Sequence, residues 1–189
     1  MKLLILLTVL STSLLATDLD FSLIGHDGSS HSLKANKGKI VVLEWFNHGC
    51  PFVRKHYDSK NMQNLQKKYK NKVVWYTINS SNVDKQGYLK NEKAAAKMYE
   101  SEGMNSKSLL IDTAGRVGQK YNAKTTPHMF IINTKGKLIY EGAIDSIASA
   151  NDNDIKKATN YVDDVLIKLT NNEDVDYFKT KAYGCSVKY

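Results

Sequence analysis

The residues best suited to chemistry are the two cysteines of the chain, Cys50 and Cys185. Cys50 stands at a corner of small residues that follows a strongly apolar segment, and a polar segment with helical spacing comes directly after it. A thiol at the first turn of a helix faces unpaired backbone N–H groups and the positive end of the helix dipole, and both favour the thiolate. Pro51 suits the first helical position, where no N–H donor is needed. The pattern therefore predicts a reactive Cys50.

Basic side chains follow Cys50 one helical turn later. Arg54 is expected to place a positive charge beside the sulfur, with Lys55 and His56 nearby, and such charges lower the pKa of a thiol. Two other interpretations stay open for Cys50. It can be a buried, inert cysteine, or it can be one half of a structural disulfide.

Glu44 interrupts the apolar strand six residues before Cys50. A carboxyl group buried in such a strand has a raised pKa, and this suits general acid–base catalysis. The alternative is a glutamate at the end of the strand that points to solvent, since glutamate is rarely fully buried.

Cys185 lies near the end of the sequence, after Tyr183 and Gly184, in a tail without clear periodicity. As a displaced resolving cysteine, it would attack a mixed disulfide or a sulfenic acid formed on Cys50, within one chain or across a dimer. Alternatively, a permanent Cys50–Cys185 disulfide would hold the tail over Cys50 and stabilise the fold by about 4 kcal/mol. An unrelated free thiol is the third interpretation, because sequence spacing does not fix geometry.

The elements that must position these residues alternate between strands and helices. Strands are expected within 21–33 (two, joined by a turn) and at 39–46, 72–79, 109–112, 129–133 and 138–142, and helices at 52–70, 86–102, 117–121 and 154–170. Parallel strands joined by helical crossovers and closed by an antiparallel hairpin predict an α/β fold. Its architecture would be a three-layer sandwich, a central mixed β-sheet with helices on both faces.

The N-terminal residues bear on the compartment. Met1-Lys2 is followed by an apolar run up to Leu10, a short Ser/Thr stretch and Ala16, the order found in a secretory signal peptide. We therefore expect residues 1–16 to be removed on export, to the periplasm if the host is Gram-negative, with a retained N-terminal anchor as the alternative. Residues 17–189 are expected to form a single domain with a C-terminal tail at 172–189.

The charge of the chain points to no particular partner. The formal net charge is +8, but the lysines are scattered rather than gathered in one run. The sequence has no aromatic-interleaved basic motif and no zinc-finger spacing. A solvated basic surface is the preferred interpretation, and no nucleic-acid partner is expected.

Four segments in a characteristic order carry a family resemblance: Val-Val-Leu-Glu-Trp-Phe-Asn-His-Gly-Cys-Pro (41–51), Leu-Ile-Asp-Thr-Ala-Gly-Arg-Val (110–117), Tyr-Asn-Ala-Lys-Thr-Thr-Pro-His-Met-Phe-Ile-Ile (121–132) and Gly-Lys-Leu-Ile-Tyr-Glu-Gly (136–142). Together they resemble the thioredoxin-like superfamily. More closely, they resemble the redoxin type, grouped with alkyl hydroperoxide reductases, thiol-specific antioxidant proteins and periplasmic thiol–disulfide oxidoreductases. The resemblance implies a thioredoxin-like fold for the single domain.

The chain departs from two patterns of this superfamily. The usual Cys-x-x-Cys is replaced by Cys-Pro-Phe-Val at 50–53, so the resolving cysteine is missing from its normal place. The Pro-x-x-x-Thr-x-x-Cys pattern of peroxiredoxins is also missing, since Leu43 and Asn47 occupy its proline and threonine positions. Neither a standard thioredoxin cycle nor a standard peroxidase site follows from the sequence.

The resemblance also implies which residues surround Cys50. Thr126 and Pro127 match the cis-proline element that faces the active-site cysteine in this superfamily, where a loop backbone can pair with a bound substrate segment. Together with Pro51 and Phe52 they are the expected substrate-binding residues.

Glu44 matches the buried acidic residue that helps to move protons to and from the active-site thiols of thioredoxins. The expected catalytic set is therefore Cys50, Cys185, Glu44 and Arg54. His128 follows the proline, and a role in strand packing is as plausible for it as a role in the site.

The leading functional prediction is an exported thiol–disulfide oxidoreductase or thiol antioxidant, with Cys50 as nucleophile and Cys185 as the resolving cysteine. No cofactor and no bound metal are expected for this chemistry. The expected partners are a thiol or disulfide protein substrate, or peroxide, and an external reductant or partner oxidoreductase. A homodimer is one option.

Two other functions stay open. One is a copper-binding metallochaperone with a thioredoxin-like fold, because thiolate and imidazole suit Cu(I). Its candidate ligands are Cys50, Cys185, His48, His56 and His128, although the paired Cys-x-x-x-Cys spacing is absent. The other is a non-catalytic domain held by a structural Cys50–Cys185 disulfide.

Overall fold

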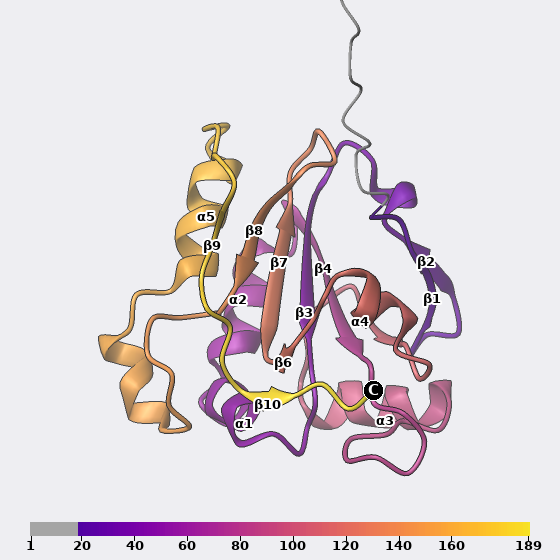
Figure 1. Ribbon diagram of the computed structural model, residues 1–189. Coiled ribbons are helices and arrows are strands. Elements are labelled where there is room, and N and C mark those ends of the chain that lie inside the picture. Colours follow the sequence, from indigo (N-terminus) through magenta and orange to yellow (C-terminus); the bar gives the residue numbers. More distant parts are fainter. Residues whose placement is uncertain (1–18) are drawn as a thin grey trace, which may run out of the picture.

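The computed structural model describes residues 19–189 (Figure 1), so the expected signal peptide at 1–16 lies outside the described residues. Within them, an eight-stranded mixed sheet has the order β2–β1–β5–β4–β3–β7–β8–β9. Its strands are β1 (Ser22–Gly25), β2 (Ser30–Ser32), β3 (Ile40–Trp45), β4 (Val73–Asn79), β5 (Ser108–Ile111), β7 (His128–Ile132), β8 (Leu138–Gly142) and β9 (Phe178–Lys179). Strands β3, β4 and β5 are parallel, whereas β7 runs antiparallel to β3 and β8 antiparallel to β7.

Helices cover both faces of this sheet. They are α1 (Pro51–Asp58), α2 (Asn61–Tyr69), α3 (Glu92–Ser101), α4 (Arg116–Lys120) and α5 (Tyr161–Thr170), with two 3₁₀ turns, η1 (Lys34–Asn36) and η2 (Asp152–Lys157). Apolar side chains of α1, α2, α3 and α5 form one core with one face of the sheet, and Val117 of α4 packs into the core on the other face. The three-layer α/β sandwich predicted from the sequence is confirmed.

Strand β3 is the axis of the fold and leads to the first cysteine. All six of its residues are buried. Val42 belongs to the core beneath α1 and α2, while Val41 and Leu43 belong to the core on the opposite face. A strand buried on both faces is a continuous apolar run in the sequence, which is why this strand was predictable.

The helix expected at 52–70 is two helices in the structure. Lys60 adopts a left-handed conformation with φ of 62°, which an α-helix cannot continue through. Helix α1 therefore ends at Asp58, and α2 starts afresh at Asn61.

Two further helices begin later than expected, and in each an asparagine caps the first turn. The side chain of Asn91 accepts a hydrogen bond from the amide of Ala94 at the start of α3. The side chain of Asn160 accepts one from the amide of Asp163 at the start of α5. Asparagine is among the best N-cap residues, so the predicted acidic start at 154 gives way to a separate 3₁₀ turn, η2.

The tail after α5 is ordered by two short strands that its sequence pattern did not predict. Strand β9 adds to the sheet edge beside β8. Strand β10 (Cys185–Ser186) pairs with β6 (Thr125–Thr126) in a separate two-stranded sheet. In Figure 1 the yellow tail runs down the edge of the sheet and then crosses below the lower ends of its central strands. Among residues 19–189, none of the helices has the length and apolar character of a membrane span.

Candidate active site

Cys50 occupies the N-cap position of α1. Its backbone is extended, with φ of −88° and ψ of 122°, and Pro51 follows as the first helical residue. The Cys50 carbonyl accepts the amide hydrogens of Val53 and Arg54 at 3.0 and 2.9 Å, so the residue is fixed to the first turn. Its side chain is fully buried. The thiol therefore lies at a helix N-terminus, as predicted from the sequence.

The Thr126–Pro127 peptide bond is cis, as the family resemblance implied. This turn lies at the start of β7, next to the end of β3 from which Cys50 follows. The Thr126 carbonyl oxygen lies 3.0 Å from the Cys50 sulfur and accepts a hydrogen bond from the thiol. The loop backbone thus contacts the thiol directly.

The second cysteine comes to the same place from the tail. In the pairing of β10 with β6, Cys185 lies opposite Thr126. The Cys185 amide donates to the Cys50 sulfur at an N–Sγ distance of 3.4 Å. Both cysteines are free thiols in the structure. The two residues are thus neighbours in the fold, although Val53 and not a cysteine holds the usual resolving position.

The two thiols differ in acidity. Burial raises the pKa of Cys50, but hydrogen bonds with Cys185 and Thr126 outweigh it, so that the pKa of the Cys50 thiol is lowered overall. Burial, together with the hydrogen bond to Cys50 and the charge on it, raises the pKa of Cys185 to about 11. Cys50 is therefore the more acidic thiol of the pair, and the amide of Cys185 donates a hydrogen bond to its sulfur.

A buried ionic cluster holds the tail just before Cys185. The Tyr183 hydroxyl donates to the Asp145 carboxylate at 2.5 Å, and the Lys55 ammonium donates to the same carboxylate at 2.9 Å. The Lys55 side chain is 0% exposed and the Asp145 side chain 3%. His56 lies 3.3 Å from the Tyr183 hydroxyl, and burial lowers its pKa to about 4. The neutral imidazole therefore adds no charge to the cluster at neutral pH.

The tail is also held after Cys185. The amide of Val187 donates to the carbonyl of Lys124 at 3.1 Å, and the carbonyl of Lys188 accepts from the amide of Asn82 at 2.8 Å. The Tyr189 hydroxyl donates to the Ala123 carbonyl at 2.7 Å. Anchors on both sides therefore keep Cys185 against Cys50.

Arg54 takes a different place from the one predicted. Its guanidinium forms two hydrogen bonds of 2.6 Å with the Glu102 carboxylate and an ion pair of 3.1 Å with Asp58. The lowered pKa of Cys50 comes from hydrogen bonds with Cys185 and Thr126 instead. Arg54 thus joins α1 to the end of α3, and its charge is engaged by carboxylates rather than placed beside the sulfur.

Glu44 is buried, so the alternative of a solvent-facing glutamate is wrong. Its carboxyl group is 1% exposed. It accepts hydrogen bonds from Tyr57 at 2.7 Å, Trp75 at 2.8 Å, Gln66 at 3.0 Å and Thr77 at 3.3 Å. Burial raises the pKa of Glu44 to about 7, against the effect of these donors. A carboxyl group with such a pKa can both take up and release a proton at neutral pH.

The remaining predicted residues divide between the surface next to the tail and the core. Phe52 packs edge to face on Tyr183, with ring centroids 5.8 Å apart, whereas Pro51 is exposed. His128 is buried and packs on Phe130 at 4.4 Å. Burial, with a smaller effect of Lys124, lowers the His128 pKa to about 4. Phe52 therefore contacts the tail, and His128 has the packing role.

A metal site has little support in the part of the chain described. No group of three or more His, Cys, Asp or Glu side chains within residues 19–189 is arranged to hold a metal ion. The copper interpretation would therefore depend on the two facing thiols, Cys50 and Cys185.

Sequence reasoning missed the residues that seat the tail. The sequence identifies Tyr183 and Gly184 only as neighbours of Cys185, and it identifies Lys55 only as a positive charge near Cys50. Asp145 carried no signal, because its pairing with Lys55 joins residues 90 positions apart. The one available signal is the Tyr-Gly-Cys string itself, an aromatic residue and a glycine next to the second cysteine of the chain.

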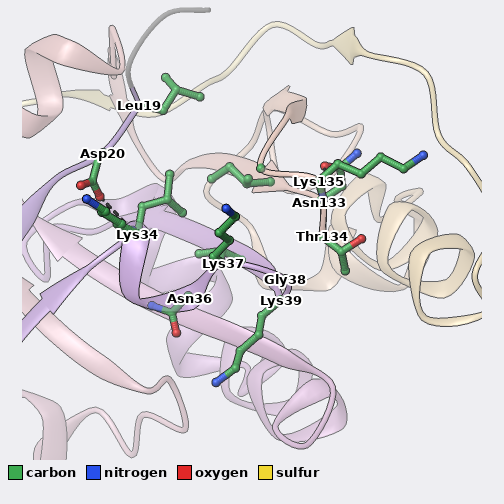
Figure 2. Close-up of a pocket in the computed structure, with 14 residues that line it drawn as sticks. Leu19, Asp20, Lys34, Asn36, Lys37, Gly38, Lys39, Asn133, Thr134 and Lys135 are labelled. Atoms are coloured by element: carbon green, nitrogen blue, oxygen red, sulfur yellow. Dashed lines mark hydrogen bonds between the residues drawn. The ribbon is translucent and has the colours of Figure 1, made fainter.

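A cavity of about 560 Å³ lies at the opposite end of the sheet from the thiols. It is bounded by the start of β3 and the turn between β7 and β8, and Figure 2 shows Lys34, Lys37, Lys39 and Lys135 around it. Because β3 and β7 are antiparallel neighbours, the cavity is separated from Cys50 by the length of β3. It has no part in the site described above.

Comparison with known proteins places the chain in a family. The Redoxin family model matches residues 15–160. Solved structures with similar folds include a hypothetical protein from Sinorhizobium meliloti 1021 (TM-score 0.71, 18% identity, covering 90% of this chain and 91% of that one). An uncharacterized conserved protein from Geobacillus kaustophilus also has a TM-score of 0.71, with 23% identity over 90% of this chain and 88% of that one.

A secreted Mycobacterium tuberculosis disulfide oxidoreductase, homologous to E. coli DsbE, has a TM-score of 0.51 and 18% identity over 64% of this chain and 81% of that one. A comparison with curated proteins gives no match. At these identities the solved structures establish the thioredoxin-like fold, and the family model establishes membership. The chain belongs to the Redoxin family.

Proposed function

We propose that this protein is an exported thiol–disulfide oxidoreductase in which Cys50 is the nucleophile and Cys185 is the resolving cysteine. The observation that carries the proposal is the placement of the Cys185 amide 3.4 Å from the Cys50 sulfur, with both residues free thiols. Membership of the Redoxin family supports the same chemistry. Export is supported by the signal-like N-terminus, and by the secreted disulfide oxidoreductase among the structural neighbours.

The reaction proceeds through two exchanges. The Cys50 thiolate attacks one sulfur of a client disulfide, so that a Cys50–client disulfide forms and the other client sulfur leaves as a thiolate. Cys185 then loses its proton and attacks the Cys50 sulfur. The Cys50–client bond breaks, the client leaves as a second thiolate, and a Cys50–Cys185 disulfide remains. The client gains two electrons, and an external dithiol must return the protein to its reduced state.

The two thiols suit these two roles. The hydrogen bonds that lower the pKa of Cys50 supply a thiolate for the first attack. Cys185, with a pKa of about 11, must give up its proton before the second attack. Glu44, with a pKa of about 7, is the buried group proposed to exchange protons with the thiols. In Glu44→Gln, the pH profile of Cys50 reactivity should change shape, and an unchanged profile would remove Glu44 from the mechanism.

The substrate-binding role is assigned to Thr126, Pro127, Pro51 and Phe52. The cis turn brings the Thr126 carbonyl to the sulfur, and Phe52 contacts Tyr183 of the tail. Protein disulfides are the proposed substrates, and a partner oxidoreductase or small thiol is the proposed reductant. A peroxide would enter the same cycle by converting Cys50 to a sulfenic acid, which Cys185 would condense with to give the same disulfide and water.

A trapping experiment tests this function. Reduced Cys185→Ser protein mixed with oxidised glutathione should accumulate a stable glutathionyl adduct on Cys50, because no second thiol can displace it. The wild type should instead form the Cys50–Cys185 disulfide and release glutathione. Absence of an adduct in Cys185→Ser, with the protein folded, would contradict the proposal.

A further inference from the structure

The surface formed by Phe52, Lys55, Thr125 and Thr126 beside Cys50, here called the tail-binding surface, is covered by the chain's own tail. Strand β10 pairs antiparallel with β6, with Cys185 opposite Thr126 and Ser186 opposite Thr125. This is the arrangement by which an extended peptide adds a strand to an exposed edge. The tail therefore marks the path and the register of any second polypeptide that brings a cysteine to Cys50.

Gly184 sets the first requirement on such a polypeptide. Its φ of +135° lies in a region that side chains rarely adopt, and a Cβ atom there would clash with the Thr126 carbonyl oxygen. That oxygen belongs to the residue before the cis bond to Pro127 and is itself in contact with the Cys50 sulfur. Any cysteine that arrives in this register must therefore follow a glycine.

Tyr183 sets the second requirement. Its ring packs on Phe52, and the Lys55 ammonium lies 5.4 Å from the ring centroid. Its hydroxyl donates to Asp145 and also lies within 3.2 Å of the Lys55 nitrogen. Because Lys55 and Asp145 are almost completely buried, this part of the tail-binding surface is a built site for an aromatic ring with a hydroxyl group.

We propose that the tail-binding surface is a selective client site that admits an extended segment of another polypeptide with the sequence Tyr-Gly-Cys, and that the tail competes with the client for it. This inference rests on the proposed function. Client and tail pair with the same edge at Thr126, so they exclude one another. The tail must leave before the client disulfide reaches Cys50. It returns as the client strand leaves the edge, and the Cys185 thiolate then attacks the Cys50 sulfur of the mixed disulfide and expels the client as a thiolate.

The test uses full-length Cys185→Ser protein, in which an adduct on Cys50 cannot be resolved. Three peptides, Tyr-Gly-Cys-Ser-Val, Tyr-Ala-Cys-Ser-Val and Ala-Gly-Cys-Ser-Val, each carry thionitrobenzoate on the cysteine, and its release reports the attack by Cys50. We expect the first peptide to react about tenfold faster than either of the others. Equal rates would overturn the selectivity. No release from any peptide would contradict the thiol–disulfide chemistry itself.

A second pair of variants tests the competition. In Gly184→Ala, placed in the Cys185→Ser background, the tail cannot dock in its register, so the reaction with Tyr-Gly-Cys-Ser-Val should speed up about tenfold. Gly136→Ala in the same background is the matched control, because Gly136 also has a positive φ of +76° but a Cβ there meets no atom within 4 Å. Equal rates in the two variants would show that the tail does not compete.

Discussion

The backbone amide of Cys185 points at the sulfur of Cys50, with 3.4 Å between nitrogen and Sγ. The second thiol of the site thus comes from a tail strand at the far end of the sequence, while a buried valine, Val53, fills the place where thioredoxins have it. The environment of Cys50 therefore depends on whether the tail is docked. We therefore expect the acidity and reactivity of Cys50, and the access of a client to it, to depend on that one contact.

The acidity of Cys50 should depend on the side chain of Cys185. In Cys185→Ala the backbone amide remains but the hydrogen bond between the two sulfur atoms is lost, so the pKa of Cys50 should rise and its thiolate fraction at neutral pH should fall. The ultraviolet absorbance of the thiolate, followed against pH, measures this directly. Ser186→Ala, which changes the exposed neighbour, is the control and should leave the midpoint in place. A midpoint in Cys185→Ala at or below the wild-type value would contradict this account of the thiolate.

The buried Glu44 should make the stability of the fold depend on pH. Its pKa rises from 4.5 in the unfolded chain to about 7 in the fold, so the folded state holds the proton more tightly. The stabilisation of the fold by protonated Glu44 is fully present below pH 4.5 and is lost as the pH rises through 7. The free energy of unfolding should fall by roughly 3 kcal/mol over this range. Glu44→Gln should remove this dependence.

Urea unfolding at a series of pH values gives the free energy of unfolding of the wild type and of Glu44→Gln as a function of pH. The slopes of these two curves are then compared. Glu173→Gln, at an exposed position, is the control and should keep the wild-type slope. If Glu44→Gln and wild type lose stability in parallel over this range, Glu44 does not titrate as described.

The Tyr183 hydroxyl should contribute to the docking of the tail. Tyr183→Phe keeps the ring against Phe52 but loses the hydrogen bond to the buried Asp145 carboxylate. Hydrogen bonds to charged groups contribute about 1.5–3 kcal/mol, so the Cys185 amide should exchange its hydrogen with solvent at least about tenfold faster. Tyr177→Phe removes the hydroxyl of an exposed tyrosine that is bonded to the half-buried Glu141 and should change little. Equal exchange in the two variants would rule out the hydroxyl as a tail anchor.

The buried Lys55–Asp145 pair should be much more important for stability than an exposed pair of the same kind. Lys55→Met leaves the carboxylate of Asp145 buried without its cation, which should cost about 3–5 kcal/mol in the free energy of unfolding. Lys68→Met breaks the pair with Asp163, in which Lys68 is 49% exposed, and should cost about 0–1 kcal/mol. Urea unfolding of both variants makes the comparison, and similar losses would contradict the role given to the buried pair.

The parts of the site that the sequence predicts are those with a local signal. The apolar run of β3 requires a central strand, and Cys50 followed by Pro51 is a typical start of a helix. The cis bond before Pro127 followed from the family resemblance rather than from the residues alone. These features depend on short segments, so their arrangement could be inferred without the rest of the fold.

The tail could not be predicted in this way. Strands β9 and β10 contain two residues each, too few for an alternating pattern, and they are held by contacts with distant parts of the chain. The break between α1 and α2 depends on the left-handed conformation of Lys60. A lysine rarely adopts this conformation, and no pattern in the sequence predicts it. Only the folded chain shows that Cys185 reaches Cys50.

The most direct test of the central claim is thiol-trapping mass spectrometry of the wild-type protein equilibrated across a series of glutathione redox buffers. We predict a disulfide between Cys50 and Cys185 that opens and closes at a potential between about −120 and −270 mV, the range of redox-active dithiol proteins. A bond that stays closed below about −300 mV would be a structural disulfide, and it would contradict the assignment of Cys185 as the resolving cysteine.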